Sequence, residues 1–203
     1  MSLGIEALFP TPLWLTEWPQ AAQRNQVLRR DIERLMGKQE DDRLKRKSNR
    51  RGWKGPASRM NSDPWTSETW SPLTEFLYAA VSEVLAEDRE FVLMTPGLNV
   101  HGEGGVNMSH IHPGCILSGV YYIACPPGSG ELVFGDPRVQ CAYAMHYQHF
   151  KHDLGGSQVT VAPSEGTLLL FPSWLAHAVE PNSGFGLRMS LPINVYLEGR
   201  ATP

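Results

Sequence analysis

The distribution of apolar and polar positions divides the chain near residue 90 into a helical part and a strand-rich part. In residues 20–36 and 72–85, apolar side chains recur at intervals of three and four, which is typical of helices that cover a sheet. Ser71 is a suitable N-cap for the second helix, and Pro72 suits its first turn. The apolar positions are Val27, Leu28, Ile32, Leu35 and Met36 in the first helix and Leu73, Phe76, Leu77, Ala80, Val81, Val84 and Leu85 in the second.

After residue 90, short segments rich in Val, Ile, Leu and Tyr alternate with turns that contain Gly and Pro. No helical pattern separates these segments, so an antiparallel sandwich or small barrel is favoured over βαβ units. We therefore expect a mostly β (α+β) fold, a jelly roll with flanking N-terminal helices. The expected strands are 91–94, 115–125, 131–134, 158–161, 167–171, 176–179 and 187–197.

Length and composition fit one domain with a sizeable core, since the chain has 203 residues of which 41% are hydrophobic. We expect a single domain over 1–203, in which 1–90 form the helical part packing on the sheet and 91–203 form the jelly-roll core. No stretch of eighteen apolar residues and no signal-peptide pattern occurs, so no membrane association is expected. The three cysteines form no CxxC pair, which indicates a reducing, cytoplasmic setting.

A basic segment lies between the two expected helices. Residues 38–59 contain nine of the eighteen Lys and Arg, while the whole chain has a net charge of −3. One interpretation is a phosphate-binding arm in which Trp53 stacks on a base. Because nearby acidic residues dilute the charge, we favour a solvated, mobile loop over 38–62 and expect no nucleic-acid partner.

Three histidines have the spacing of a metal site on a β-barrel. His110 and His112 are two residues apart, so at the end of a strand both imidazoles face the same side. His177 follows much later, in another short strand. Neutral imidazole binds iron, zinc, copper and nickel, and three facial ligands leave positions open for other molecules. Half-exposed structural histidines are the alternative.

An arginine in an apolar strand adds a second signal. Arg188 lies in the segment 187–197, where a lone guanidinium is costly unless an anion meets it. Ser190 has the same parity on that strand, so the pair is suited to clamp a carboxylate. An edge-strand arginine that points to solvent is the alternative.

These motifs together resemble the 2-oxoglutarate and iron(II)-dependent oxygenases, whose pattern is His-x-(Asp or Glu), a distant His and then Arg-x-Ser. The resemblance is greatest to a bacterial and cyanophage subgroup with a His-x-His motif, and it is densest over residues 100–197. It is carried by the segments 110–123 (HIHPGCILSGVYYI), 135–138 (GDPR), 163–179 (PSEGTLLLFPSWLAHAV) and 188–194 (RMSLPIN), and by the opening 8–14 (LFPTPLW).

The resemblance implies a double-stranded β-helix that uses Fe(II) and 2-oxoglutarate. Residue by residue, it implies His110, His112 and His177 as iron ligands. It implies Arg188 and Ser190 as the clamp for the far carboxylate of 2-oxoglutarate, assisted by Tyr122, with Ser118 lining the same pocket. The implied activity is a dioxygenase that hydroxylates a small-molecule or peptide substrate and releases succinate and carbon dioxide.

One position departs from the superfamily pattern. His112 stands where the carboxylate ligand usually lies, which removes one negative charge and leaves room for another metal such as zinc or nickel. Asp136 is an alternative source of a carboxylate, although Gly-Asp-Pro first indicates a turn. A second metal site at His146, His149 and His152 is an alternative to exposed loop histidines. His101 is interpreted as structural or pocket-lining.

Two rival functions remain open on the sequence. One is a cupin-like metalloenzyme that does not use 2-oxoglutarate and so has no need of Arg188. The other is a non-catalytic jelly roll that binds a small acid or a protein. The substrate is not readable from these motifs, and a homodimer is only the base-rate expectation.

Overall fold

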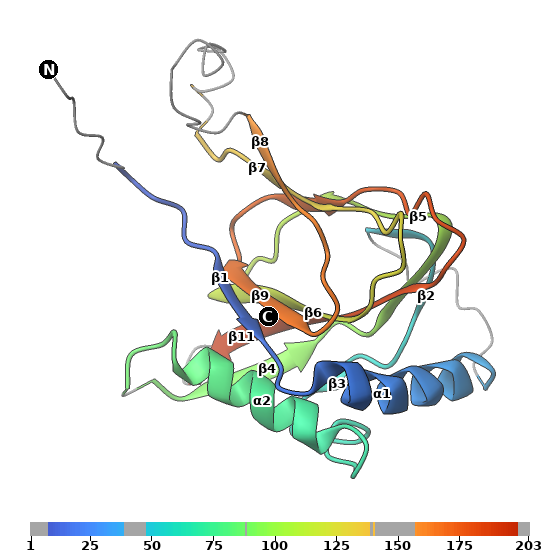
Figure 1. Cartoon of the computed structure of the whole chain (residues 1–203). Helices are drawn as coiled ribbons and strands as arrows, with labels where there is room; N and C mark the ends of the chain where they lie inside the picture. Colours follow the sequence, from blue (N-terminus) through green and yellow to red (C-terminus); the bar gives the residue numbers. More distant parts are fainter. Residues whose placement is uncertain (1–7, 39–47, 88, 139, 141–156, 199–203) are drawn as a thin grey trace, which may run out of the picture.

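A computed structural model describes residues 8–38, 48–87, 89–138, 140 and 157–198 (Figure 1). It contains a curled sheet of short strands and two helices. The helices are α1 (Ala21–Met36) and α2 (Ser71–Ser82). The strands are β1 (Trp14–Glu17), β2 (Asn49–Lys54), β3 (Ser58–Arg59), β4 (Phe91–Thr95), β5 (Asn99–His110), β6 (Leu117–Ala124), β7 (Leu132–Gly135), β8 (Gln158–Val161), β9 (Thr167–Pro172), β10 (His177–Val179) and β11 (Arg188–Leu197).

All strand pairs of the described sheet are antiparallel, in the order β1-β9-β6-β11-β5-β10-β7-β8. Strand β2 pairs with β5, and β4 joins β11 to β3. Neighbours in space are therefore mostly distant in sequence, as in a jelly roll. This confirms the expected mostly β fold with flanking N-terminal helices.

Two apolar clusters fill the two faces of the curled sheet. Both helices lie on one side of it (Figure 1), and their buried residues, such as Ile32 and Leu77, belong to the same cluster as Ile123 and Leu191. A smaller cluster lines the inside of the curl. Because side chains alternate along a strand, each central strand divides its residues between the two clusters. The inner cluster is formed by Val120, Tyr122, Leu132, Phe134, Leu169, Phe171, Leu175 and Val179.

Strand β11 carries this alternation into the site. Met189, Leu191, Ile193 and Val195 belong to the outer cluster. The intervening positions face inward, and three of them are polar residues that line a cavity: Arg188, Ser190 and Asn194. A buried strand with one apolar and one polar face thus presents its polar face to the cavity.

The N-terminal part differs in detail from the expectation. The segment expected to be a loop over 38–62 contains β2 and β3, and β2 pairs with β5. Residues 39–47 lie outside the described part. Strand β1 pairs with β9, and Ser71 is the first residue of α2 with Trp70 at the N-cap. Among the described residues, no helix is long and apolar enough to cross a membrane.

Candidate metal and cosubstrate site

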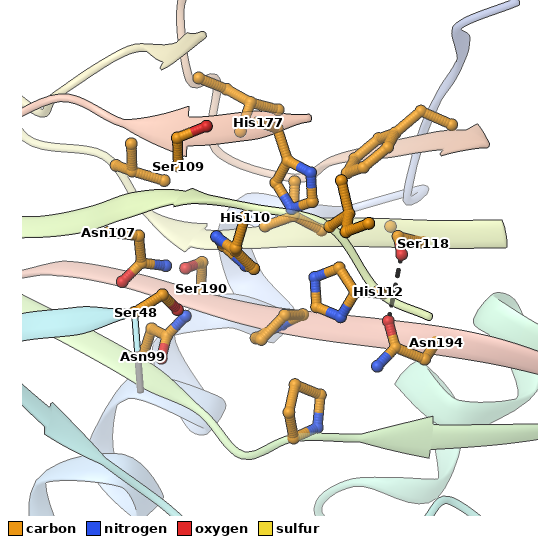
Figure 2. A pocket seen from close by; sticks show the side chains of 18 of the residues that line it. Ser48, Asn99, Asn107, Ser109, His110, His112, Ser118, His177, Ser190 and Asn194 are labelled. Carbon is orange, nitrogen blue, oxygen red and sulfur yellow. Dashed lines mark hydrogen bonds between the residues drawn. The ribbon is translucent and has the colours of Figure 1, made fainter. Parts of the chain in front are cut away.

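The three predicted metal ligands converge on one point inside the sheet (Figure 2). His110 ends β5 and pairs directly with His177, the first residue of β10. His112 lies beyond the end of β5, so the turn, and not the expected strand alternation, brings it to the same face. The backbone N–H of His112 donates to the carbonyl of Ser173 at 3.0 Å, which fixes that turn. One ring nitrogen from each histidine lies within 4.8 Å of those of the others.

Hydrogen bonds to the backbone orient two of the three imidazoles. Nδ1 of His110 lies 2.7 Å from the carbonyl oxygen of Met108, and Nδ1 of His177 lies 2.9 Å from that of Leu175. A carbonyl only accepts, so Nδ1 carries the proton in each ring and Nε2 keeps its lone pair. This is the arrangement in which protein histidines bind metals.

The environment keeps all three imidazoles neutral. Burial lowers the pKa of His110, and it lowers the pKa of His177 to about 4. Burial, followed by the charge of the neighbouring histidines, lowers the pKa of His112 to about 3. Because only the unprotonated nitrogen binds a cation, this set is ready to bind a metal at neutral pH.

The predicted carboxylate clamp lies on the inner face of β11. Arg188 is 1% exposed, and its Nη1 donates to Ser190 Oγ at 3.2 Å. Its guanidinium carbon lies 5.2 Å from the ring centroid of Tyr122, which is fully buried. Arg188 Nε and Nη2 and Tyr122 Oη have no hydrogen-bond partner among the described residues. A buried cation with free donors beside a free phenol fits a ligand carboxylate.

The histidines, Arg188 and Ser190 line a single cavity of about 460 Å³. Ser118 also lines this cavity, four residues from Tyr122 along β6. Its Oγ donates a hydrogen bond to Asn194 Oδ1 at 3.2 Å (Figure 2). Ser118 pairs with Asn194 and Tyr122 pairs with Ser190, so Ser118 lies farther along β11 from the guanidinium than Tyr122 does.

Other predicted residues lie elsewhere. Asp136 is not part of the histidine group, and its Oδ2 pairs with Arg138 Nη2 at 2.7 Å. His146, His149 and His152 fall outside the described residues. His101 is fully buried beside Arg188, in the register of β5 with β11.

Several residues that line the cavity were not among the predicted site residues. Asn99, Asn107 and Ser48 lie together on the Ser190 side of the histidines, and Asn194 lies on the other side (Figure 2). Asn194 has the same parity on β11 as Arg188 and Ser190, so that signal was present in the sequence. Lys54 of β2 also lines the cavity, and its charge contributes to lowering the pKa of His110 and His112.

Comparisons with known proteins identify the family of the segment that carries this site. Residues 98–194 match a family model described as "Putative 2OG-Fe(II) oxygenase". This range contains the three histidines and the arginine clamp. No curated protein matches the sequence at a significant level.

Solved structures share the fold at low sequence identity. A Pseudomonas putida prolyl-4-hydroxylase is 17% identical, with a TM-score of 0.63 over 93% of this chain and 94% of that chain. HygX from Streptomyces hygroscopicus, solved with nickel and 2-oxoglutarate, is 12% identical, with a TM-score of 0.62 over 95% and 85%. A Trichoplax adhaerens prolyl hydroxylase in complex with a peptide fragment is 14% identical, with a TM-score of 0.62 over 91% and 83%.

At these identities the solved structures show a common fold, and the family match supplies the activity class. The match covers the segments that carry the three converging histidines and the buried arginine. The chain therefore contains, over residues 98–194, a domain of the 2-oxoglutarate and iron(II)-dependent oxygenase family.

Proposed function

We propose that the protein hydroxylates a small-molecule or peptide substrate, with Fe(II) bound by His110, His112 and His177. The observation that carries this proposal is the pairing, in one cavity, of three neutral imidazoles with a buried arginine that lacks an anionic partner among the described residues. A metal site alone suits many enzymes. The adjacent guanidinium, whose Nε and Nη2 have no partner among the described residues, favours a cosubstrate with a carboxylate at its far end.

With Fe(II) and 2-oxoglutarate bound, the site would use dioxygen as the oxidant: one oxygen atom would enter a C–H bond of the substrate and the other would leave in succinate, while 2-oxoglutarate, the electron donor, loses carbon dioxide. The protein holds the ligand geometry. His110 and His177 donate their Nδ1 protons to backbone carbonyls, which aims Nε2 of each ring inward. No acid–base pair is needed among the side chains for this chemistry.

Arg188, Ser190 and Tyr122 form the proposed binding site for the far carboxylate. Arg188 offers Nε and Nη2 as free donors. Burial raises the pKa of Tyr122 to about 12, so its hydroxyl stays protonated and donates as well. Ser190 holds the guanidinium through its Oγ. We assign Ser118 to the lining of the same cavity.

The all-histidine ligand set affects charge in the site. Three neutral imidazoles leave the full charge of a divalent metal uncompensated until an anion binds. Described residues that line the cavity include Lys54 and Arg188 but no carboxylate. The dianionic cosubstrate therefore enters a strongly positive cavity, which favours its binding.

The substrate is assigned only to a broad class. Two structural neighbours were solved with a peptide fragment and with hygromycin B. In this chain Met108 and Ile111 line the cavity and are 55% and 48% exposed, which offers apolar contacts at its mouth. We propose a small molecule or a peptide side chain at this mouth, in a cytoplasmic enzyme, as the cysteine pattern favours.

The test is anaerobic visible absorption of metal-free protein, titrated with Fe(II) and then with 2-oxoglutarate. A weak charge-transfer band that requires both additions supports chelation of the cosubstrate at the iron. Iron binding without the band favours the cupin-like alternative. Absence of iron binding overturns the proposal, because the histidines are then structural.

A further inference from the structure

The carboxylate clamp leaves several buried polar atoms unexplained. Among the described residues, the buried side-chain atoms without a hydrogen-bond partner belong to just five residues: Asn49, His101, Asn107, Tyr122 and Arg188. The cosubstrate carboxylate accounts for Tyr122 Oη and for two of the three N–H groups on Arg188 Nε and Nη2, which leaves one N–H for another acceptor. It does not account for both ring nitrogens of His101 or for the amide oxygens of Asn49 and Asn107. Orphan groups are costly in a protein interior, so a cluster of them needs a role.

These residues form one continuous group around His101. In the sheet register, His101 of β5 pairs with Arg188 of β11 on one side and with Gly52 of β2 on the other. A Cβ at Gly52 would lie 2.4 Å from His101 Cδ2 and 2.5 Å from Asn49 Oδ1. The glycine therefore lets the β2 backbone pack directly on the imidazole, with the Asn49 amide beside it.

The imidazole of His101 is a neutral ring with one donor and one acceptor. Burial, followed by the positive charge of Arg188, lowers its pKa to about 4. The side chain of Asn107 is near enough to raise the pKa of His101 and so to oppose part of this shift. Even so, neither ring nitrogen of His101 has a hydrogen-bond partner of acceptable geometry. The free groups around the ring match its needs: amide oxygens for its N–H and guanidinium N–H groups for its lone pair.

We propose that His101 positions the cosubstrate clamp, accepting a hydrogen bond from Arg188 and donating one to the amide oxygen of Asn107 or Asn49. This inference rests on the proposed function, since the clamp is the one that binds 2-oxoglutarate. His101 acts through Arg188 and does not touch the metal. Binding of the carboxylate orders the guanidinium, and the imidazole holds it in that orientation.

The proposal extends the cosubstrate site beyond the matched family domain. Asn49 Nδ2 donates to Asn99 Oδ1 at 3.1 Å, which ties β2 to the cavity wall of β5. Asn49 and Gly52 lie outside residues 98–194. Strand β2, in the segment first interpreted as a basic loop, thus supports the residues that orient Arg188.

The test compares two ligands on three proteins. 2-Oxoglutarate and 2-oxopentanoate have the same chain length and the same chelating end, but only 2-oxoglutarate has the far carboxylate. Their dissociation constants are measured anaerobically with Fe(II), by the charge-transfer band, for wild type, His101→Phe and His101→Gln. We expect His101→Phe to weaken 2-oxoglutarate about tenfold, the effect of one hydrogen bond to a charged group. Binding of 2-oxopentanoate stays within about twofold of wild type.

His101→Gln is the rescue variant, because glutamine keeps one donor and one acceptor; we expect 2-oxoglutarate affinity within about threefold of wild type. Equal weakening of both ligands by His101→Phe, or no weakening of either, overturns the inference and leaves the proposed function standing. A wild-type protein that binds Fe(II) but not 2-oxoglutarate overturns both.

A measurement on the wild type covers the case in which His101→Phe does not fold. With Zn(II) as a diamagnetic ion, ¹⁵N NMR of histidine-labelled protein follows the His101 ring, whose signals are identified by their absence from His101→Gln. We expect a shift of one His101 ring nitrogen on adding 2-oxoglutarate but none with 2-oxopentanoate. The same response to both ligands contradicts the positioning role.

Discussion

Arg188 lies over the ring of Tyr122, with its guanidinium carbon 5.2 Å from the ring centroid. Both side chains are buried, and both keep unpaired donor atoms in the described structure. The contact with the ring face partly compensates the buried charge. It leaves Nε and Nη2 of the guanidinium free, where a carboxylate would bind through two hydrogen bonds. This relationship underlies the first prediction.

Replacing Arg188 with Met is expected to have opposite effects on the stability of the ligand-free protein and on the binding of 2-oxoglutarate. Without 2-oxoglutarate we expect Arg188→Met to raise the free energy of unfolding by roughly 1 kcal/mol or more, because it removes a buried charge that lacks a counter-ion. With 2-oxoglutarate and metal, the variant loses about 100-fold or more in affinity for the cosubstrate. Denaturant unfolding with and without 2-oxoglutarate measures both effects.

Arg50→Met is the matched control for this experiment, because Arg50 is an exposed arginine on β2. We expect it to leave both the unfolding free energy and the stabilisation by 2-oxoglutarate near wild-type values. If Arg188→Met is still stabilised by 2-oxoglutarate as strongly as the wild type, the clamp assignment is wrong.

The histidine group predicts a loss of metal binding on a single substitution. His177→Ala removes one of three converging ligands. We expect the affinity for Fe(II) to fall by at least about 100-fold, because even the loss of a residue that only orients a metal ligand lowers metal affinity by up to this factor. Isothermal titration with Fe(II) under anaerobic conditions measures this. His101→Gln serves as a control and retains wild-type Fe(II) affinity, because His101 is not part of the group. Unchanged binding by His177→Ala contradicts the ligand assignment.

The helices and the inner strands were predictable from local sequence patterns. Apolar spacing of three and four residues marks α1, and the apolar runs of β6, β9 and β11 mark strands that are buried on both faces. The histidines and Arg188 were also identifiable from the sequence. The histidines have the spacing of metal ligands, and a charged residue such as Arg188 is rare in an apolar strand.

Strand β2 shows why other parts were not predictable. Its sequence, NRRGWK, has no apolar alternation, and both of its arginines are exposed. It is a strand because its backbone pairs with β5, which is a non-local contact that no local pattern encodes. The place of His101 depends on the same pairing and on the register of β5 with β11, so no motif marks it.

Ser118 tests how far the cosubstrate site extends along β6. Its Oγ is already bound to Asn194 Oδ1, and it lies four residues from Tyr122. We therefore expect Ser118→Ala to change 2-oxoglutarate affinity by less than about threefold, since a neutral hydrogen bond contributes about 1 kcal/mol or less net. The dissociation constant is measured with the charge-transfer band, beside Arg188→Met. A loss as large as that of Arg188→Met instead places Ser118 in direct contact with the cosubstrate.

The ionisation of His101 predicts a pH-dependent stability of the metal-free protein. Its pKa falls from 6.5 in the unfolded chain to about 4 in the folded protein, through burial and then the charge of Arg188. Between these values only the unfolded state takes up the proton at this position, so the contribution of His101 to stability is full above pH 6.5 and declines as the pH falls toward 4. The shift corresponds to a loss on the order of 3 kcal/mol from this one group.

His101→Gln isolates that contribution, because glutamine does not titrate and Arg188 remains beside it. Urea unfolding at several pH values gives the difference in unfolding free energy between wild type and variant. We expect this difference to be constant above pH 7 and to move in favour of the variant as the pH falls to 4. The other titrating groups cancel in the comparison. A difference that stays flat over the whole range means that His101 is not held neutral beside Arg188, which removes the hydrogen-bond acceptor on which the positioning role depends.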